Sequence, residues 1–496
     1  MVRTGDMNNE LYPNEIPNWI NGHEQDANSG KTLDKLNPHN GELLSRVARS
    51  GEEDVRQAVA AAKEAQPAWA ELPGVRRGEI LHSVAMGLRE HREEVARVVA
   101  LETGKSYSAS LSETDAAVAL GLFMAGEGQR LYGRTTTTGV PHKYAMTVRQ
   151  PLGVAALIIA ANTPIANVAW KVFPALICGN SAVIKAAEDT PGTALSFSKI
   201  AHEAGLPAGV LNVVQGYGEE AGPPLVAHPD VAVISFTGST KVGREIAREA
   251  GGRLARISLE LGGKNPLVVC DDADLENAAK WVLLSSFSNA GQRCASGSRI
   301  IIFESVYDRF RDMLIERTKE LKVGPGDEDD FGPVINERQL TNMLGALERA
   351  RQSGVRILTG GMRLTDPEHY NGFYMAPTLV EGADPGHEIS LTELFGPIAC
   401  LYRANNFREA LRLANDSPYG LTACIHTRNL HRAIEFTNKV QAGVAVVNAG
   451  TFGSEPHMPF GGLKQSGNGS REPGTEALDV YSNLKDPYIS INPDEC

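Results

Sequence analysis

The chain has 496 residues and is acidic: 60 Asp and Glu against 48 Lys and Arg give a formal net charge of -12 and an isoelectric point near 5.6. This charge disfavours nucleic acid and anionic membrane surfaces as partners, and no segment reaches the roughly 18 uninterrupted apolar residues of a membrane-spanning helix. With 42% hydrophobic and 22% charged residues, the composition is typical of a globular enzyme with two or three domains.

The cysteines and histidines give no sign of a disulfide framework or a metal site. The six cysteines include no C-x-x-C pair, and the 12 histidines include no H-x-x-x-H pair. Residues Met1–Glu10 lack the apolar core of a signal peptide. We therefore expect a cytoplasmic protein with reduced thiols and no bound metal.

The first 150 residues predict helices followed by a β-hairpin. Ser50 and Glu53 have the spacing of a capping box, and the stretch from Gly78 to Leu101 has helical periodicity. The threonine-rich segment 133–150 alternates polar and β-branched residues, as an exposed hairpin arm does. The open strand edges of such an arm favour pairing with a second copy of the chain.

Beyond residue 151, short apolar runs alternate with helical patterns. Strands are expected over 154–160, 181–187, 210–215, 231–236 and 256–261, and a helix over 240–250. This alternation predicts a parallel sheet covered on both faces, the usual architecture of a nucleotide-binding domain. A strand over 299–303 and a helix opened by Ser305 indicate a second α/β domain.

Three segments carry nucleotide signals of different strength. Gly216–Gly222 follows a strand, but its G-x-G-x-x-x-G spacing is one residue too long for the dinucleotide fingerprint, so alone it indicates a turn. Phe236–Gly243 closes a strand and opens a helix, where backbone N–H groups and the Ser239 hydroxyl could bind a pyrophosphate; the alternative is an ordinary helix cap.

The third signal is a strand end that bears Lys185 and Glu188. A carboxylate at this position can accept the ribose hydroxyls of NAD and repel the 2′-phosphate of NADP. The alternative is two solvated charges.

The clearest chemical signal is a cysteine with a carboxylate upstream. F-S-N-A-G-Q-R-C at 287–294 places Cys294 behind a glycine-containing turn, although a lone cysteine is usually an inert core residue. L-E-L-G-G-K at 259–264 puts Glu260 in an apolar run, where its pKa would be raised toward that of a working base. Together they predict a nucleophile and a general base.

These two motifs are followed by E-L-F-G-P at 393–397 and P-F-G-G at 459–462, and in this order they resemble the NAD(P)-dependent aldehyde dehydrogenases over nearly the whole chain. The resemblance implies an α/β fold with three parts. These are an atypical Rossmann cofactor-binding domain (1–133 and 152–262), an α/β catalytic domain (263–465), and a β-hairpin oligomerisation arm with a tail (134–151 and 466–496). It also implies a homodimer or homotetramer.

The resemblance also assigns roles to residues. Cys294 would attack the aldehyde, Asn162 and the Cys294 N–H would stabilise the oxyanion, and Glu260 would activate water to hydrolyse the thioester left after hydride transfer. The cofactor would be NAD, with NADP possible. The implied cofactor-binding residues are Ile158, Lys185, Glu188, Gly218, Gly222, Phe236, Gly238, Ser239, Val242, Leu261, Gln339, Glu393 and Phe395.

The substrate region departs from the usual family pattern. The family's P-W-N-F-P run reads A-A-N-T-P at 160–164, which removes two aromatic side chains, and the loop 448–459 also differs. The expected substrate-side residues are Asn167, Trp170, Arg293, Phe452, His457 and Phe460, with Lys171 along the entrance. Arg293 and His457 could hold an anionic group, which favours a small polar or anionic semialdehyde.

Other functions remain open from the sequence. Trp170 would suit an aromatic or aliphatic aldehyde. A CoA-acylating semialdehyde dehydrogenase would use the same cysteine, although Glu260 favours water as the acyl acceptor. A non-catalytic relative is the remaining alternative, and the joint presence of Cys294, Glu260, Asn162 and Glu393 disfavours it.

Overall fold

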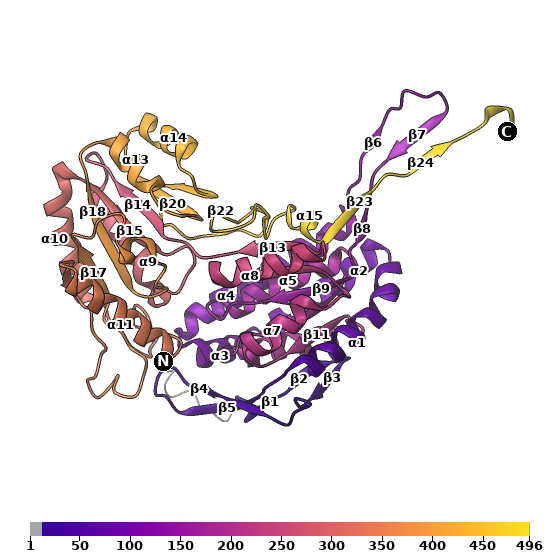
Figure 1. Cartoon of the computed structure of the whole chain (residues 1–496), viewed down its shortest axis with the longest axis horizontal. Coiled ribbons are helices and arrows are strands. Elements are labelled where there is room, and N and C mark those ends of the chain that lie inside the picture. Colours follow the sequence, from indigo (N-terminus) through magenta and orange to yellow (C-terminus); the bar gives the residue numbers. More distant parts are fainter. Residues whose placement is uncertain (1–11, 496) are drawn as a thin grey trace.

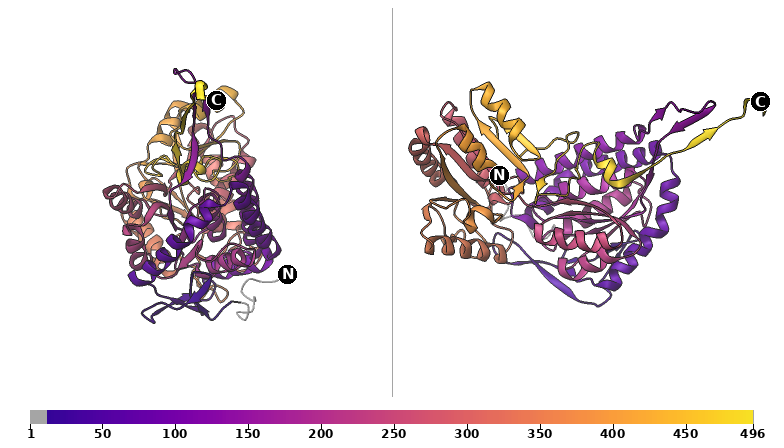
Figure 2. Two further views of the ribbon diagram at one scale, coloured as in Figure 1. Left: turned by 90° about the vertical axis from the view of Figure 1, so that its right-hand side faces the viewer. Right: turned by 45° about the horizontal axis from the view of Figure 1, so that its top comes forward.

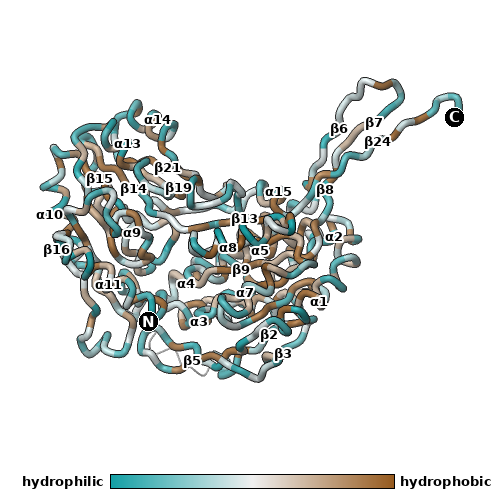
Figure 3. The backbone as a smooth tube through the Cα atoms, in the orientation of Figure 1, coloured by the Kyte–Doolittle hydropathy of each residue, from teal (hydrophilic) through white to brown (hydrophobic). Residues whose placement is uncertain are grey.

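A computed structural model of the chain describes residues 12–495, so the prediction made for Met1–Glu10 lies outside the described residues. Two seven-stranded sheets form the two halves of the body, and a narrow arm extends away from one of them (Figure 1). Apolar residues concentrate along the strands and the inner faces of the helices (Figure 3). No helix within 12–495 is long and apolar enough to cross a membrane.

The first sheet has the order β13-β12-β9-β10-β11-β2-β3. Its parallel strands are β9 (Val154–Ile158), β10 (Ser181–Lys185), β11 (Leu211–Val214), β12 (Val231–Thr237) and β13 (Arg256–Glu260), with β2 (Asn18–Ile20) and β3 (His23–Gln25) antiparallel at one edge. The five predicted strands are confirmed. Their nearly continuous apolar residues reflect burial on both faces of a parallel sheet.

Helices cover both faces of this sheet, as predicted. Ala155 and Leu157 of β9 pack into one core, and Val154 and Ala156 pack into the other. One face is covered by α2 (Gly74–Glu90), α3 (Arg92–Thr103), α4 (Tyr107–Gly126), α5 (Pro164–Ile177) and α6 (Pro191–Glu203), and the other by α1 (Glu52–Glu71), α7 (Gly218–Ala227) and α8 (Thr240–Gly252). The chain order reverses at β9, and ligands of such sheets bind outside the carboxyl ends of the strands at that point.

The second sheet has the order β16-β17-β18-β15-β14-β20-β21. Its strands are β14 (Asn265–Val269), β15 (Gly297–Phe303), β16 (Arg356–Thr359), β17 (Thr378–Glu381), β18 (Ile398–Ala404), β20 (Thr422–His426) and β21 (Val444–Val447), and only β16 is antiparallel to its neighbour. Its helices are α9 (Leu275–Phe287), α10 (Glu304–Glu320), α11 (Glu337–Gln352), α12 (Glu388–Leu391), α13 (Phe407–Asn415) and α14 (Leu430–Lys439). The predicted second α/β unit is confirmed.

Two predicted helix starts were wrong, those of α1 and α10. Helix α1 begins one residue later than its predicted capping box, because the Asp54 carboxylate accepts from the Gly51 N–H at 2.9 Å. The helical periodicity predicted over 78–101 is confirmed, as two helices that meet at His91. Helix α10 begins at Glu304 directly after β15, without a side-chain cap, so Ser305 does not open it.

The arm is a set of short antiparallel strands, which confirms the predicted hairpin. Strands β6 (Thr135–Thr136), β7 (Lys143–Met146) and β24 (Tyr488–Ser490) form one sheet, and β8 (Val148–Pro151) pairs with β23 (Ser482–Lys485). Figure 2 shows the arm leaving the body beside the C-terminal strand. The hairpin and the tail therefore meet in the arm, as expected.

The remaining elements lie on the body. They are β1 (Glu15–Ile16), β4 (Thr32–Leu36), β5 (Leu43–Ala48), β19 (Tyr419–Gly420), β22 (Leu463–Lys464) and α15 (Ala477–Tyr481). Ser466, Glu472 and Tyr481 are fully buried, so the first half of the tail packs into the body and only the part from Ser482 enters the arm. The domain boundaries stay a prediction.

Candidate active site

The candidate site lies where the carboxyl ends of strands in the first sheet meet the amino ends of strands in the second sheet. Glu260 is the last residue of β13, and Asn162 follows the carboxyl end of β9. Cys294 lies in the turn that enters β15, at the amino end of the second sheet. The chain passes from β13 into β14 through the short segment Leu261–Lys264, so the base and the nucleophile belong to opposite sheets joined by one link.

The turn before Cys294 has a strained backbone. Asn289, Ala290 and Gly291 have φ angles of 56°, 52° and 66°, a left-handed region that costs a non-glycine residue about 1 kcal/mol or more. A Cβ on Gly291 would lie 2.2 Å from the carbonyl oxygen of Gly396, so only glycine fits. The nucleophile turn is thus fixed against the segment 393–397.

Cys294 is held from its other side by the link between the sheets. The Asn265 side-chain amide donates to the Cys294 carbonyl at 2.7 Å, and a Cβ on Gly263 would lie 2.5 Å from the same oxygen. Burial, followed by the charges of Glu393 and Glu260, raises the pKa of Cys294 to about 12. The ligand-free protein therefore keeps this residue as a thiol.

Asn162 lies beside the nucleophile turn. Its Nδ2 donates to the Gln292 carbonyl at 3.0 Å, and Asn289 Nδ2 donates to the Asn162 carbonyl at 3.4 Å. A carboxamide carries two N–H donors, so one remains for an oxygen bound near Cys294. This is the arrangement expected of an oxyanion donor.

Glu260 is a buried carboxylate without a partner. It is 5% exposed, and neither of its oxygens has a hydrogen-bond partner in residues 12–495. Burial, reinforced by the charge of Glu472, raises its pKa well above the ordinary value, while Lys171 and Arg471 act in the opposite direction. A Cβ on Gly461 would lie 2.7 Å from Glu260 Oε1. The P-F-G-G motif at 459–462 therefore lies directly beside Glu260.

Behind Glu260 lies a buried ion pair that the sequence did not reveal. Glu472 accepts from Lys171 Nζ at 3.1 Å, from Ser235 Oγ at 3.0 Å and from the Tyr481 hydroxyl at 2.9 Å. The Lys171 side chain is 1% exposed, so its predicted place along the substrate entrance was wrong. Only its position in the apolar helix α5 could have hinted at burial.

Glu393 contacts the link between the sheets. Its Oε1 accepts from the Gly263 N–H at 2.9 Å, and a Cβ on Gly262 would lie 2.0 Å from its Oε2. Burial raises the pKa of Glu393 to about 7. Phe395 follows with φ 55°, and these two predicted cofactor residues line a small cavity together with Gly291 and Arg293.

Lys185 and Glu188 lie at the carboxyl end of β10. Lys185 Nζ donates to the Ala186 carbonyl at 2.5 Å and lies 3.8 Å from Glu188 Oε2, and burial lowers the pKa of Lys185 to about 8. A Cβ on Gly218, at the start of α7, would lie 3.9 Å from the same Glu188 oxygen. A Cβ on buried Gly222 would meet no atom within 4 Å, which leaves space beside this helix.

The other predicted cofactor residues gather at the same edge. Ser239 caps α8 by accepting from the Val242 N–H at 3.4 Å, and a Cβ on Gly238 would lie 2.5 Å from the Phe236 ring. Ile158 ends β9 opposite Lys185 and Phe236, Leu261 packs under Gly243 of α8, and Gln339 lies in the first turn of α11. The structure therefore brings strand-end, glycine and carboxylate groups to the carboxyl end of the first sheet.

The predicted substrate residues form two aromatic contacts and one unpaired cation. Trp170 packs edge-on against Phe460 with ring centres 5.5 Å apart. Arg293 lies over the Phe452 ring at 4.4 Å, and in the described chain it makes no ion pair or hydrogen bond.

Two other predicted substrate residues are less available to a ligand. The Asn167 amide donates back to Thr163 at 2.8 Å within its own helix. His457 is exposed and lies 3.6 Å from Glu455.

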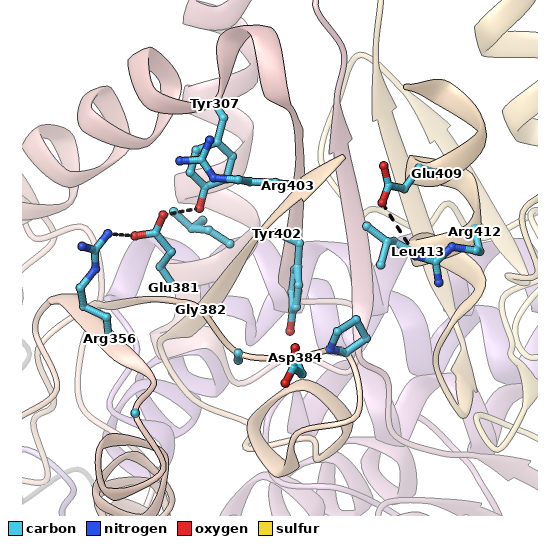
Figure 4. A pocket seen from close by; sticks show the side chains of 14 residues that line it. Tyr307, Arg356, Glu381, Gly382, Asp384, Tyr402, Arg403, Glu409, Arg412 and Leu413 are labelled. Atoms are coloured by element: carbon cyan, nitrogen blue, oxygen red, sulfur yellow. Dashed lines mark hydrogen bonds and ion pairs between the residues drawn. The ribbon is translucent and has the colours of Figure 1, made fainter. Parts of the chain in front are cut away.

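A separate surface cavity of about 650 Å³ lies near the carboxyl ends of β17 and β18 (Figure 4). There the Tyr307 hydroxyl donates to Glu381 at 2.9 Å, and Arg356 pairs with the same carboxylate. Its charged groups are thus satisfied within the chain. Within 12–495, no group of three or more His, Cys, Asp or Glu could hold a metal ion.

Comparison with known proteins agrees with this geometry. Residues 25–486 match the model of the aldehyde dehydrogenase family. The chain is 38% identical over 479 residues to the alpha-ketoglutaric semialdehyde dehydrogenase of Bacillus subtilis (strain 168), covering 96% of this chain and 98% of that protein. Its fold matches a crystal structure of betaine aldehyde dehydrogenase from Staphylococcus aureus in complex with NAD+, with a TM-score of 0.94, 33% identity, and coverage of 96% of this chain and 95% of that one. The chain belongs to the aldehyde dehydrogenase family.

Proposed function

We propose that this protein oxidises an aldehyde to the carboxylic acid, with NAD as the hydride acceptor, through a thiohemiacetal and a thioester on Cys294. The observation that carries the proposal is the convergence of four distant motifs on one place. The buried, unpartnered carboxylate of Glu260 and the strained Cys294 turn meet there.

Cys294 begins the reaction by attack of its sulfur on the carbonyl carbon. The oxygen that becomes negative lies within reach of the Cys294 backbone N–H and of the free amide hydrogen of Asn162. When bound, the nicotinamide would supply the hydride acceptor and, as a cation, a charge that favours the Cys294 thiolate. The turn fixed by Gly291 holds the sulfur in position throughout.

Glu260 completes the reaction by activating a water molecule that attacks the thioester. Its two oxygens accept no hydrogen bond from the described chain, so they are free to bind that water. Its raised pKa gives it the affinity for a proton that a base near neutral pH needs. Water as the acyl acceptor distinguishes this proposal from a CoA-acylating enzyme, and assays of acid and acyl-CoA products in the presence of CoA test the distinction.

Residues at the carboxyl end of the first sheet and in the segment 393–397 fit a nicotinamide dinucleotide. Glu393 and Phe395 would hold the nicotinamide ribose and ring, and Glu188 would accept the adenosine ribose hydroxyls. The Gly238–Ser239 turn offers backbone N–H groups at the start of α8 for the pyrophosphate. Equilibrium binding of NAD to the ligand-free protein, with Glu393→Gln as the weakened variant, tests this assignment.

We further propose a small aldehyde with an anionic tail as the substrate. Burial lowers the pKa of Lys105. The charge of Glu113 raises that pKa, and the charge of Arg293 lowers it, which places Arg293 near this pair. Lys105 already pairs with Glu113, so two cations share one carboxylate and Arg293 is left without a counter-charge. A substrate carboxylate could supply it, and the B. subtilis relative bears the name of such a semialdehyde dehydrogenase.

A substrate panel tests this choice. Short anionic semialdehydes should exceed benzaldehyde and hexanal in kcat/KM, and Arg293→Ala should reduce that advantage roughly tenfold to a hundredfold, while Arg293→Lys retains part of it. His457→Ala tests the second candidate cation. A higher kcat/KM for the uncharged aldehydes in the parent protein would favour the aromatic or aliphatic alternative, which the Trp170–Phe460 pair supports.

The arm supports a homo-oligomer, either a dimer or a tetramer. Tyr144, Tyr488 and Ile489 of the arm expose large apolar surface. Strand β21 at one end of the second sheet also has an open edge. Both are features that pairing with another copy would cover.

A further inference from the structure

Three charged side chains lie close together near the nucleophile turn: Lys105, Glu113 and Arg293. Lys105 and Glu113 form an ion pair whose side chains are only 6% and 7% exposed. The charges that act on Lys105 are those of Glu113 and Arg293. The charges that act on Arg293 are those of Glu113 and Cys294, and the ligand-free protein keeps Cys294 as a thiol. The cluster therefore contains two cations and one carboxylate.

The Glu113 carboxylate is held from two sides. Its Oε1 accepts from the backbone N–H groups of Ile165 at 3.1 Å and Ala166 at 3.3 Å, in the first turn of α5, and its Oε2 accepts from Lys105 Nζ. The Thr163 side chain does not cap α5, so Glu113 satisfies these helix donors instead, and a negative charge is favourable at the start of a helix. Glu113 therefore stays in place whichever cation lies beside it.

Arg293 is linked to the same helix start. Helix α5 begins two residues after Asn162, whose Nδ2 donates to the carbonyl of Gln292, the residue before Arg293, at 3.0 Å. Arg293 is half-buried, and its guanidinium lies over the Phe452 ring at 4.4 Å. Within residues 12–495 this guanidinium makes no ion pair or hydrogen bond. It is thus a cation close to a carboxylate that another cation already occupies.

We propose that Lys105 is a positioning residue for substrate choice: by occupying the Glu113 carboxylate, it leaves the Arg293 guanidinium available to the anionic tail of a semialdehyde. Without the Lys105 ammonium, Glu113 would be a buried carboxylate that lacks a cation, which is costly. The guanidinium of Arg293 would then pair with Glu113, and the cluster would go from one positive charge in excess to none. The inference rests on the proposed anionic substrate, but it assigns the preference to a residue that acts through two others.

A double-variant cycle tests this with two four-carbon aldehydes that differ by one charge, succinic semialdehyde and butanal. Lys105→Met should lower the ratio of kcat/KM for the semialdehyde to that for butanal about tenfold. Adding Glu113→Gln should restore the ratio to within about threefold, because Arg293 then has no carboxylate to pair with and the glutamine carbonyl can still accept from α5. The control is Lys63→Met, which removes an exposed lysine of α1 that pairs with Asp230 and should leave the ratio unchanged.

The pH dependence of the same ratio in the parent protein gives a second readout. Burial lowers the pKa of Lys105, the charge of Glu113 raises it, and the charge of Arg293 lowers it. Because only the protonated amine can occupy Glu113, the ratio should be highest below this pKa and should fall as the pH rises through it. Groups that serve both aldehydes, such as Cys294 and Glu260, cancel in the ratio. The profile should be flat in Lys105→Met with Glu113→Gln.

Several outcomes would contradict the inference. An unchanged ratio in Lys105→Met, or an equal loss with both aldehydes, would show that Lys105 only supports the fold. A double variant with a ratio as low as that of Lys105→Met would show that Glu113 does not capture Arg293. If Lys105→Met does not fold, a parent ratio that stays flat up to about pH 10 decides against the inference. A parent protein that does not prefer the semialdehyde to butanal would instead refute the proposed anionic substrate, which separates that failure from failure of the Lys105 inference alone.

Discussion

Replacement of Glu260 by glutamine should leave the first half of the reaction intact and slow the second. The carboxylate is 5% exposed and neither oxygen is bonded to the described chain, so an amide of the same shape breaks no hydrogen bond there. A positioned general base contributes roughly 10²–10⁴-fold to a rate, which corresponds to about 2.7–5.5 kcal/mol of activation free energy. Steady-state turnover should therefore fall by about that factor.

Rapid mixing of the variant with NAD and aldehyde would separate the two halves. Because hydride transfer precedes hydrolysis, Glu260→Gln should release a burst of about one NADH per site before the slow steady state. Cys294→Ser should give no burst and no steady-state turnover. In the parent, hydrolysis should accelerate with rising pH through the raised pKa of Glu260, since only the ionised carboxylate acts as a base. The assignment fails if the variant shows no burst or keeps the parent's turnover.

Four further changes test other parts of the site and the arm. Gly262→Ala should weaken NAD binding at least about tenfold, because its Cβ would stand 2.0 Å from Glu393 Oε2. Calorimetry would measure the NAD affinity. The control is Gly251→Ala, where a Cβ meets no atom within 4 Å. NAD affinity should rise with pH through the Glu393 pKa of about 7 and become flat in Glu393→Gln, and a flat parent profile would contradict this role. Lys171→Met should lower the free energy of unfolding by about 3–5 kcal/mol, because it leaves Glu472 buried without a cation. The double variant Lys171→Met with Glu472→Gln should recover most of this loss. Denaturant titrations would measure both. Tyr144→Glu with Ile489→Glu should lower the sedimenting mass at equal protein concentration, and an unchanged mass would rule out the arm as an interface.

The sequence predicted the parts of the fold that depend on local pattern. The strands of the first sheet could be found because both faces of the sheet are buried, with Ile184 in one core and its neighbour Val183 in the other, so the strands are continuous apolar runs. The sequence predicted the cap of α1 one residue too early, because both Ser50 and Asp54 are residue types that suit a helix start. Only the structure shows that Ser50 Oγ donates instead to the Asn18 side chain of β2.

In the candidate site, too, local motifs could be recognised from the sequence and tertiary contacts could not. Cys294, Glu260 and Glu393 stand in motifs whose composition is itself unusual, so they could be recognised one by one. The Lys171–Glu472 pair joins residues 301 positions apart, and the Arg338–Glu188 pair crosses between the two sheets. Neither partner looks exceptional alone, and charge pairs formed only by the tertiary fold leave no periodic trace in the sequence.

The C-terminal segment has a practical consequence for engineering. Glu472 and Tyr481 sit behind Glu260, while residues from Ser482 onward form strands of the arm. A truncation meant to remove only the C-terminal strands of the arm must therefore cut after Tyr481. A stop codon between Glu472 and Tyr481 would remove the hydroxyl that donates to Glu472, and one before Glu472 would also remove the buried carboxylate that pairs with Lys171, so either truncation would disturb the surroundings of Glu260 as well as the arm.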